Sequence, residues 1–325
     1  MRIAILIACL AAGVATGGPE GPRPPESITP SGGGEALASP DTQSGGREAS
    51  ASPHAQSGGR EALASPHRIV SVVPALTETL FAIGAASRIV GVSSFDTVPP
   101  DMTSITRVGG LVDPDVERIL SLKPDLVITY ESQANFREQL ARARIPMFVY
   151  RHGGLADVVD TTRELGRRVG FQAAAENVAR RIEQKLAAVR ARVRGRARPR
   201  TMLVFGRQPL SLRGIYASGG YGFLHDMLEA AGGTNVFGDV KRESIQVTTE
   251  VILARAPDVI IELKYGNEAA GHDLERERAS WDALASVPAV RQRRVILLVG
   301  DEFVVPGPRV ADATERMALA LHPHP

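Results

Sequence analysis

The chain has 325 residues but only one cysteine, Cys9. A single thiol excludes an intramolecular disulfide framework and a cysteine-rich zinc site. Past residue 20 there is no apolar run long enough for a transmembrane helix, which needs about 20 such residues. The net charge is +2 at pH 7, and so small an excess argues against a polycationic nucleic-acid binder.

Catalytic signatures are also missing. The sequence contains no G-x-S-x-G nucleophile elbow, no P-loop and no H-E-x-x-H zinc motif. Three histidines lie away from the ends of the folded part, His152, His225 and His272, and we interpret each as a surface or core residue. We therefore expect no enzymatic activity, no cofactor and no metal site. An exported enzyme or a bare-metal chaperone is the rival interpretation.

The first 66 residues contain no aromatic side chain, yet they hold 11 of the 32 glycines and 8 of the 22 prolines. Such a segment buries too little apolar surface to offset its conformational entropy. Three similar units begin at Ser31, Ser44 and Ser57, with a period of 13 residues. We interpret residues 17–66 as a disordered Gly/Ser/Pro tether; repeat slippage without a function is the alternative.

Residues 1–16 resemble an export signal. The charged start Met1-Arg2 is followed by an apolar stretch and by small residues, and cleavage after Ala15 would suit this pattern. Leu6-Ile-Ala-Cys9 also resembles the lipobox of bacterial lipoproteins, in which Cys9 would carry the lipid. Signal cleavage and lipid attachment at Cys9 both stay open at this point.

One pattern occurs twice in the remaining chain. Residues 117–128 and 250–261 share a glutamate, an Ile-Leu pair, a Pro-Asp pair and an apolar run at the same spacings. Each copy predicts a short helix, a turn and a strand buried on both faces, because Val/Ile/Leu runs are typical of covered parallel strands. The duplication indicates two related halves.

Further strands and helices alternate along both halves, which predicts an α/β architecture with mainly parallel sheets. The other expected strands are Arg68–Val73, Arg88–Val92, Pro146–Tyr150, Thr201–Gly206 and Arg294–Val299, and the helices are Leu76–Ile83, Asn135–Ala143, Gly222–Ala231 and Val310–Leu321. A longer helix is expected over Gln172–Arg194, where one apolar stripe lies between Gly170 and Gly195.

These features together resemble the periplasmic binding proteins of ABC importers for cobalamin, ferric siderophores and haem. The matching segments are residues 68–78, 90–100, 115–128, 219–224, 231–237, 250–258 and 281–295. The resemblance implies two Rossmann-like lobes, residues 67–171 and 196–325, joined by a single long helix over 172–195 with the ligand cleft between them. The stretch Val90-Gly-Val-Ser-Ser-Phe95 with Pro99-Pro100 places the chain nearest the cobalamin-binding branch.

The resemblance implies ligand contacts from the loops that follow the strands. The candidate residues are Pro74, Phe95, Tyr130, Arg207, Tyr216, Ser218 and Glu302. Phe95 stands where cobalamin-binding relatives have a stacking aromatic, and ordinary packing is the alternative for it and for both tyrosines.

The cobalamin-binding relatives are rich in tryptophan at the cleft, whereas the matching positions here are Leu111, Tyr130 and Glu302. The only tryptophan, Trp281, is expected in the core. Arg207 suits an anionic ferric chelate or a haem propionate, although a surface arginine is the plain alternative. A ferric siderophore or haem therefore remains the alternative to a corrinoid as the small-molecule ligand.

The resemblance also implies that Glu117 and Glu250 dock the two lobes onto arginines of a two-fold symmetric permease dimer. Each glutamate would also complement the dipole of its own helix. The arginines from Arg190 to Arg200 are interpreted as a solvated helix end and not as a nucleic-acid site. The predicted function is an exported binding protein, periplasmic or membrane-anchored, that captures a cobalamin-like corrinoid and delivers it to an ABC importer.

Overall fold

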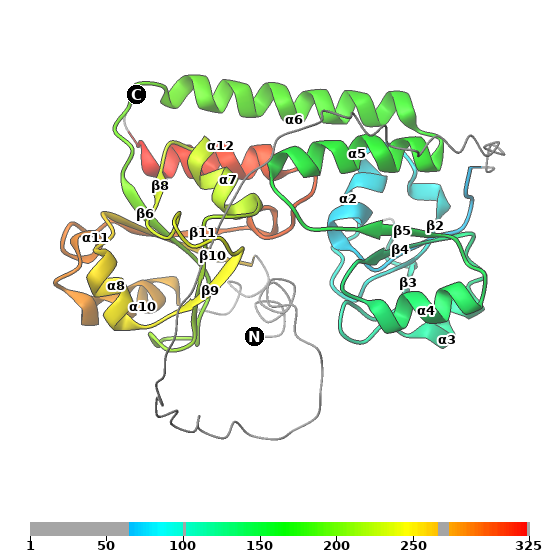
Figure 1. Cartoon of the computed structure of the whole chain (residues 1–325), viewed down its shortest axis with the longest axis horizontal. Coiled ribbons are helices and arrows are strands. Elements are labelled where there is room, and N and C mark those ends of the chain that lie inside the picture. The colour runs from blue at the N-terminus through cyan, green and yellow to red at the C-terminus, as the bar shows by residue number, and fades with distance from the viewer. Residues whose placement is uncertain (1–64, 100–101, 266–272, 324–325) are drawn as a thin grey trace, which may run out of the picture. The chain divides into compact units, whose positions relative to one another are not determined.

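The computed structural model describes residues 65–99, 102–265 and 273–323 (Figure 1). The predicted signal, Cys9 and the three 13-residue units lie outside these ranges. From Ser65 on, the chain belongs to one compact unit. Within it, two sheets form from separate halves of the sequence. The predicted α/β architecture with two lobes is confirmed.

The first lobe is built on a five-stranded sheet in the order β3-β2-β1-β4-β5, and all its pairs are parallel. The strands are β1 (Ile69–Ser71), β2 (Ile89–Val92), β3 (Thr106–Arg107), β4 (Leu126–Tyr130) and β5 (Met147–Tyr150). The central strands β1 and β4 are buried along their whole length. Their apolar runs therefore suit a sheet that is covered on both faces.

Helices connect most of the strands of the first lobe and follow its last strand. They are α2 (Pro74–Ala82), the 3-10 turn η1 (Ala86–Arg88), α3 (Val116–Ser121), α4 (Ala134–Arg142) and α5 (Leu155–Val169). Proline at the first position of α2 suits a helix start, where its missing N–H has no partner to lose. Gly170 ends α5 at φ 78°, a left-handed conformation that glycine adopts without strain.

The second lobe is built on a sheet in the order β11-β10-β6-β7-β9, with β8 paired to β6. Its strands are β6 (Arg200–Gly206), β7 (Ile215–Ser218), β8 (Thr234–Asn235), β9 (Ser244–Val247), β10 (Val259–Lys264) and β11 (Val295–Val299). The pairs β6–β7 and β7–β9 are antiparallel. The connection over residues 207–214 is too short for a parallel crossover, so this lobe is less parallel than predicted.

The helices of the second lobe cover this sheet. They are α7 (Phe223–Ala230), α8 (Thr249–Arg255), α10 (Leu274–Ala279), η3 (Ser280–Leu284), α11 (Pro288–Arg291), η4 (Asp301–Phe303) and α12 (Val310–Leu321). Trp281 is fully buried, as predicted. Its neighbours in the core of this lobe include Met202, Val204 and Ile260.

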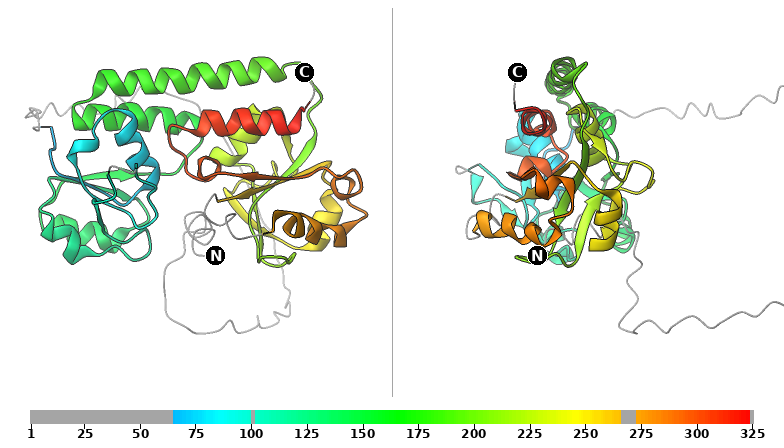
Figure 2. Two further views of the ribbon diagram at one scale, coloured as in Figure 1. Left: turned by 180° about the vertical axis from the view of Figure 1, so that it is seen from behind. Right: turned by 90° about the vertical axis from the view of Figure 1, so that its left-hand side faces the viewer.

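The predicted long helix is present as α6 (Gln172–Val193). Its apolar stripe, which includes Val178, Ile182 and Leu186, is buried, and the helix packs against α5 and α12. Figures 1 and 2 show α6 above these two helices. Since α5 lies beside it, its role as the only rigid connection stays a prediction.

The duplicated pattern forms the same substructure in both lobes. Helix α3 leads into β4, and α8 leads into β10. The aspartate of each Pro-Asp pair then fixes the start of a neighbouring strand: the Asp125 carboxylate accepts hydrogen bonds from the His67 and Arg68 amides at 2.7 and 2.8 Å. Asp258 accepts one from the Arg200 amide at 3.3 Å. The pattern therefore sets both the helix–strand turn and the strand beside it.

Candidate functional site

The carboxyl end of β1 carries the first candidate, Pro74. Pro74 is half-buried and is the first residue of α2. The turn before it is fixed by Ser71, whose hydroxyl accepts a hydrogen bond from the Thr77 hydroxyl at 2.9 Å. Parallel strands of open α/β sheets present ligand contacts at this edge. Pro74 is thus at the predicted edge, with part of its surface accessible.

Phe95 lies in the loop that follows β2. The Ser93 hydroxyl accepts a hydrogen bond from the Phe95 amide at 3.0 Å. The Arg107 guanidinium donates to the main-chain carbonyls of Ser93 and Asp96 at 2.8 and 2.7 Å. These bonds tie the loop to β3, and the half-buried ring keeps an accessible part. Phe95 is therefore a preorganised apolar surface at the edge of the first sheet.

The ring of Phe95 lies close to the backbone of Gly110. A Cβ atom at Gly110 would stand 2.5 Å from Cε2 of Phe95, which is less than a van der Waals contact. Only glycine allows the ring to lie this close to the backbone. The position of Phe95 therefore depends on the absence of a side chain at Gly110.

The next residue, Asp96, is a buried carboxyl group that the sequence analysis missed. Burial raises its pKa to about 7, although hydrogen bonds from the Thr77 side chain and the Ser93 backbone and the charge of Arg107 act in the opposite direction. Its Oδ2 atom has no hydrogen-bond partner within the described residues. A protonated Asp96 would turn this loop into a hydrogen-bond donor near neutral pH.

Tyr130 is the last residue of β4 and not a loop residue as predicted, and it is 5% exposed. Its ring is stacked with His152 at 5.9 Å between centroids and meets Tyr150 edge-on at 5.8 Å. Burial raises the pKa values of both tyrosines and lowers that of His152 to about 4, so the imidazole is neutral at pH 7. The aromatic cluster of Tyr130, Tyr150 and His152 closes this end of the sheet.

Arg207 is not placed to contact a ligand, which corrects the expectation. Its side chain is 0% exposed and lies between two buried carboxylates, with Nε 2.9 Å from Glu262 Oε1 and Nη2 2.8 Å from Glu277 Oε2. Lys264 adds a second cation, 2.8 Å from Glu262. Desolvated charges are stable only when they are paired, so we assign Arg207 a structural role.

Trp281 completes this charged network. Its Nε1 donates a hydrogen bond to Glu262 Oε2 at 2.9 Å, and the Arg207 guanidinium lies over its ring at 5.6 Å. The sequence holds one signal for this network: Glu262 interrupts the apolar run of residues 259–263 in β10. A carboxylate in a buried strand requires a cationic or hydrogen-bonding partner.

Tyr216 and Ser218 belong to strand β7 and not to a loop, because the sequence analysis missed this strand. Tyr216 is half-buried, and its ring lies 6.4 Å from that of Phe205. Ser218 is fully buried, and its hydroxyl donates to the Gly219 carbonyl at 3.0 Å. Part of Tyr216 therefore remains accessible, whereas Ser218 is inaccessible in this structure.

Glu302 follows β11, and its carboxylate forms ion pairs with two arginines. Its carboxylate pairs with Arg309 at 3.4 Å and also with Arg316, and its side chain is 15% exposed. Nearby, the Thr97 hydroxyl of the first lobe donates to the Asp301 carboxylate of the second at 3.4 Å. The loops after β2 and β11 therefore approach each other across the two lobes.

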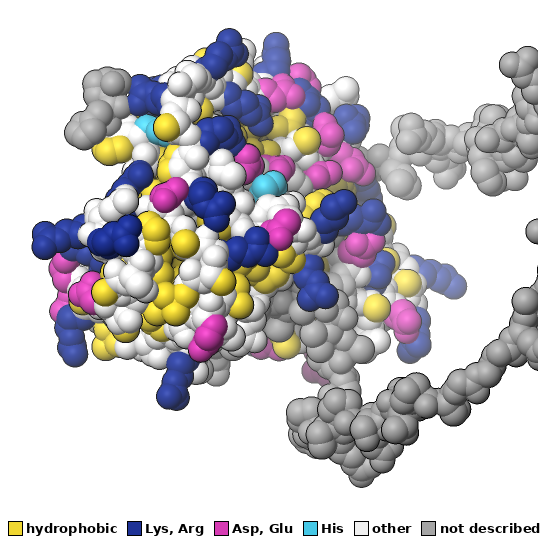
Figure 3. Space-filling model, turned by 60° about the vertical axis from the view of Figure 1, so that its left-hand side comes forward, with side chains coloured by type: hydrophobic (Ala, Val, Ile, Leu, Met, Phe, Trp, Pro, Cys, Tyr) yellow, Lys and Arg dark blue, Asp and Glu magenta, His cyan; other side chains and the backbone are white. Residues whose placement is uncertain are grey.

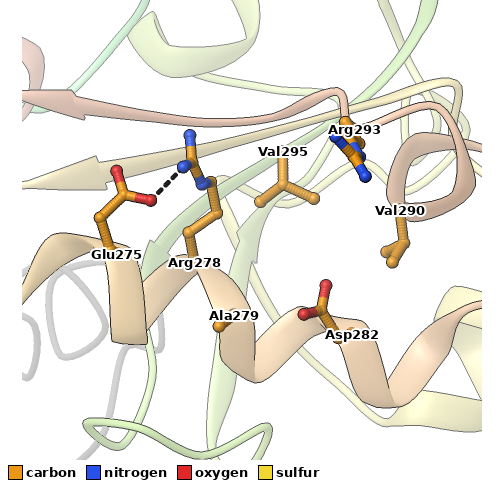
Figure 4. Close-up of a pocket in the computed structure, with 7 residues that line it drawn as sticks. All are labelled: Glu275, Arg278, Ala279, Asp282, Val290, Arg293 and Val295. Atoms are coloured by element: carbon orange, nitrogen blue, oxygen red, sulfur yellow. Dashed lines mark hydrogen bonds and ion pairs between the residues drawn. The ribbon is translucent and has the colours of Figure 1, made fainter.

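The second lobe also has a cavity of about 410 Å³, lined by residues of α10, η3 and α11 and by the start of β11. Figure 4 shows Arg278 paired with Glu275 at one end of this cavity, and Asp282 and Arg293 at the other end. Arg293 and Val295 lie at the amino end of β11. Since open α/β sheets bind ligands at the carboxyl ends of their strands, this cavity is not the candidate ligand site.

Glu117 and Glu250 occupy the same position, the second residue of α3 and of α8. Both are exposed, and both follow a polar N-cap: Asp115 accepts from the Arg118 amide at 3.0 Å, and Thr248 from the Val251 amide at 3.5 Å. The pKa of Glu250 is lowered, chiefly by a hydrogen bond from Thr248. Two exposed carboxylates thus project from equivalent helix starts.

Within the described ranges, no group of three or more His, Cys, Asp or Glu side chains is placed to hold a metal ion. His225 is half-buried near Asn235, and His272 lies outside those ranges. Among the helices that the structure describes, none has the length and apolar character required to cross a membrane.

Residues 69–301 match the family model described as periplasmic binding protein. The chain belongs to the periplasmic binding protein family. The vitamin B12-binding protein of Salmonella typhimurium strain LT2 is 33% identical to it over 259 residues, which cover 78% of this chain and 90% of that protein. The cobalamin-binding protein of Halobacterium salinarum strain R1 is 29% identical over 270 residues, 78% of this chain and 69% of that protein.

Solved structures of periplasmic binding proteins share the fold. The periplasmic heme-binding protein RhuT from Roseiflexus sp. RS-1 has a TM-score of 0.67 and 28% identity, covering 79% of this chain and 98% of its own. The periplasmic vitamin B12 binding protein BtuF of Vibrio cholerae has the same TM-score at 24% identity, covering 79% and 97%. The predicted family and fold are therefore confirmed.

Proposed function

We propose that this periplasmic binding protein captures a cobalamin-like corrinoid at the carboxyl edges of its two sheets. The observation that carries the proposal is the 33% identity to a vitamin B12-binding protein over nearly all of the folded chain. Phe95 at the site also supports the proposal. Its ring is half-buried and keeps its place because Gly110 has no side chain. An apolar face of this kind suits the flat side of a large macrocycle.

The competing ligand is haem or a ferric siderophore. The observation that favours it is the aromatic cluster of Tyr130, Tyr150 and His152, together with the fold shared with a haem-binding protein at 28% identity. Arg207 no longer supports this ligand, since both of its carboxylate partners lie within the second lobe. The loss of that cation from the site favours the corrinoid.

Equilibrium dialysis of the full chain against cyanocobalamin, haemin and a ferric hydroxamate tests the ligand class. We expect retention of cyanocobalamin and about tenfold weaker retention by Phe95→Ala, because an aromatic contact contributes about 1 kcal/mol or more. Leu319→Ala, at 52% exposure in α12, is the control and should retain the ligand fully. Retention of haemin alone would contradict the proposal.

We further propose that the chain is exported, acts as a carrier without catalytic turnover and delivers its ligand to an ABC permease dimer. Residues 1–16 would direct export, Cys9 is the candidate lipid attachment site, and residues 17–66 would form the tether. Glu117 and Glu250 support the docking step, since equivalent exposed carboxylates suit a two-fold partner. The domain limits 67–171, 172–195 and 196–325 belong to the same proposal.

Docking is tested with the double variant Glu117→Ala, Glu250→Ala. We expect unchanged ligand affinity in the isolated protein and loss of ligand uptake in cells that depend on this chain. Glu138→Ala with Glu275→Ala is the matched control, since both glutamates are exposed and lie in helices, one in each lobe. Normal uptake by the first double variant would contradict the docking role.

A further inference from the structure

Two exposed leucines stand at equivalent positions of the duplicated helices. Leu120 in α3 is 41% exposed and Leu253 in α8 is 44% exposed. Each comes three residues after a glutamate, Glu117 or Glu250, and residues three apart are neighbours on one helix face. Each helix therefore carries a carboxylate and a large apolar side chain side by side.

The packing of each helix explains why these leucines face outward. The preceding residues, Ile119 and Ile252, are both 0% exposed and attach their helices to the core. Because successive helical residues point about 100° apart, the leucine that follows is turned away from the core. A single exposed leucine is ordinary; the same exposure at both copies of one pattern calls for a shared cause.

We propose that Leu120 and Leu253 are a matched pair of apolar anchors for a two-fold symmetric membrane permease. The inference rests on the proposed function and deepens its docking step. Each leucine would enter an apolar pocket of one permease subunit, and the adjacent glutamate would pair with a cation at the rim of that pocket. Protein interfaces are commonly built in this way, with a dry apolar centre and a polar border.

Charge decides between this partner and a second copy of the chain. Both patches carry an exposed carboxylate, whereas an arginine in each of the two helices is already engaged: Arg118 pairs with Asp115 and Arg255 with Asp239. Two copies would therefore bring like charges together, which is unfavourable at short range. A basic partner with two equivalent sites fits both patches at once.

The placement of the two helices agrees with a single partner. In Figures 1 and 2, α3 and α8 each lie on the side of their lobe away from α6. The face of the second lobe that Figure 3 turns forward also shows hydrophobic side chains with both basic and acidic side chains around them. One flat partner can therefore contact both helices without displacing α6.

The test measures ATP hydrolysis by a cobalamin permease–ATPase complex in lipid nanodiscs as the concentration of the full, ligand-loaded chain is raised. Leu120→Gln and Leu253→Gln keep the helix propensity while they remove the apolar surface. We expect each to raise the half-saturating concentration about fivefold, and the double variant about 25-fold, because distant sites act additively. Similar effects of the two single variants are part of the prediction.

The matched control is Val149→Thr with Leu319→Gln, at 42% and 52% exposure on other surfaces, which should match the wild type. If the wild type stimulates ATP hydrolysis and the double leucine variant has the same half-saturating concentration, the two leucines are not anchors, although the docking step would stand. A wild-type chain that binds corrinoid but stimulates no permease would overturn the docking step itself. A wild-type dimer in sedimentation that the leucine variants abolish would assign the patches to a second copy.

Discussion

Glu78 and Arg309 form an ion pair across the two lobes although they are 231 residues apart in sequence. Glu78 lies in α2 of the first lobe, and Arg309 is the N-cap residue of α12 in the second. The guanidinium uses Nε at 3.1 Å and also Nη2 on the same carboxylate. A two-point contact of this kind restricts how the lobes move against each other.

Removal of this contact should loosen the lobes without unfolding either of them. We expect Arg309→Met to lower the free energy of unfolding by about 1 kcal/mol, since the arginine is 41% exposed and such pairs contribute little. Amide hydrogen exchange in α2 and α12 should become faster. Exchange that is unchanged in both helices would show that the pair does not restrain the lobes; Arg167→Met, an exposed arginine in α5, is the control.

The buried network around Arg207 gives a prediction about stability. Arg207→Met leaves Glu262 and Glu277 desolvated and short of one cation, so we expect a loss of about 3–5 kcal/mol in urea unfolding. The affinity for the ligand should not change in the fraction that remains folded. Arg213→Met, an exposed arginine in the same loop, should be neutral. If Arg207→Met lowered the affinity for the ligand and left the stability unchanged, Arg207 would have to be assigned to the ligand site.

Asp96 predicts a dependence of stability on pH. Burial raises its pKa from the ordinary value of 3.8 to about 7, so the folded state holds this proton more tightly than the unfolded chain does. Stability should therefore fall as the pH rises from about 4 to 7 and then level off. Over this range the contribution is at most about 4 kcal/mol.

The variant Asp96→Asn removes this titration. Compared with the wild type, it should gain stability at pH 8 and lose that advantage at pH 4, as measured by urea midpoints at the two values. A constant difference between the two proteins at both pH values would mean that folding does not raise the pKa of Asp96.

A substitution at Gly110 should lower the affinity for the ligand and leave the packing of the core unchanged. Gly110→Ala would push Cβ against the Phe95 ring, and the ring would leave its position in the loop after β2. We expect a ligand affinity about as low as that of Phe95→Ala, with the unfolding free energy changed by less than about 1 kcal/mol. Wild-type affinity in this variant would show that the ligand does not use the ring as it lies here.

The architecture followed from sequence because its signals are local. The apolar runs predicted the central strands, and the repeated glutamate, Ile-Leu and Pro-Asp positions predicted two equivalent helix–strand units. Strand β7 was not predicted because it has only four residues, Ile215–Ser218, which is too short for a clear pattern. Nor does a single strand indicate the direction in which it pairs. Direction was set by the short connection after β6.

The candidate site was less predictable because its side chains are fixed by distant partners. Arg207 was assigned to a ligand, yet its hydrogen-bond partners Glu262 and Glu277 come 55 and 70 residues later in the chain. Asp96 was overlooked because its raised pKa comes from burial, which no short motif encodes. Phe95 was identified by its place after β2, and the role of Gly110 beneath it needed the structure.

The most direct measurement is a calorimetric titration of the full chain with cyanocobalamin, followed by haemin and a ferric hydroxamate. We expect one corrinoid per chain with a dissociation constant of about 1 μM or lower, equivalent to a binding free energy near −8 kcal/mol. We also expect much weaker heats with the iron chelates. No heat with cyanocobalamin, together with tight binding of haemin or the ferric chelate, would contradict the corrinoid assignment.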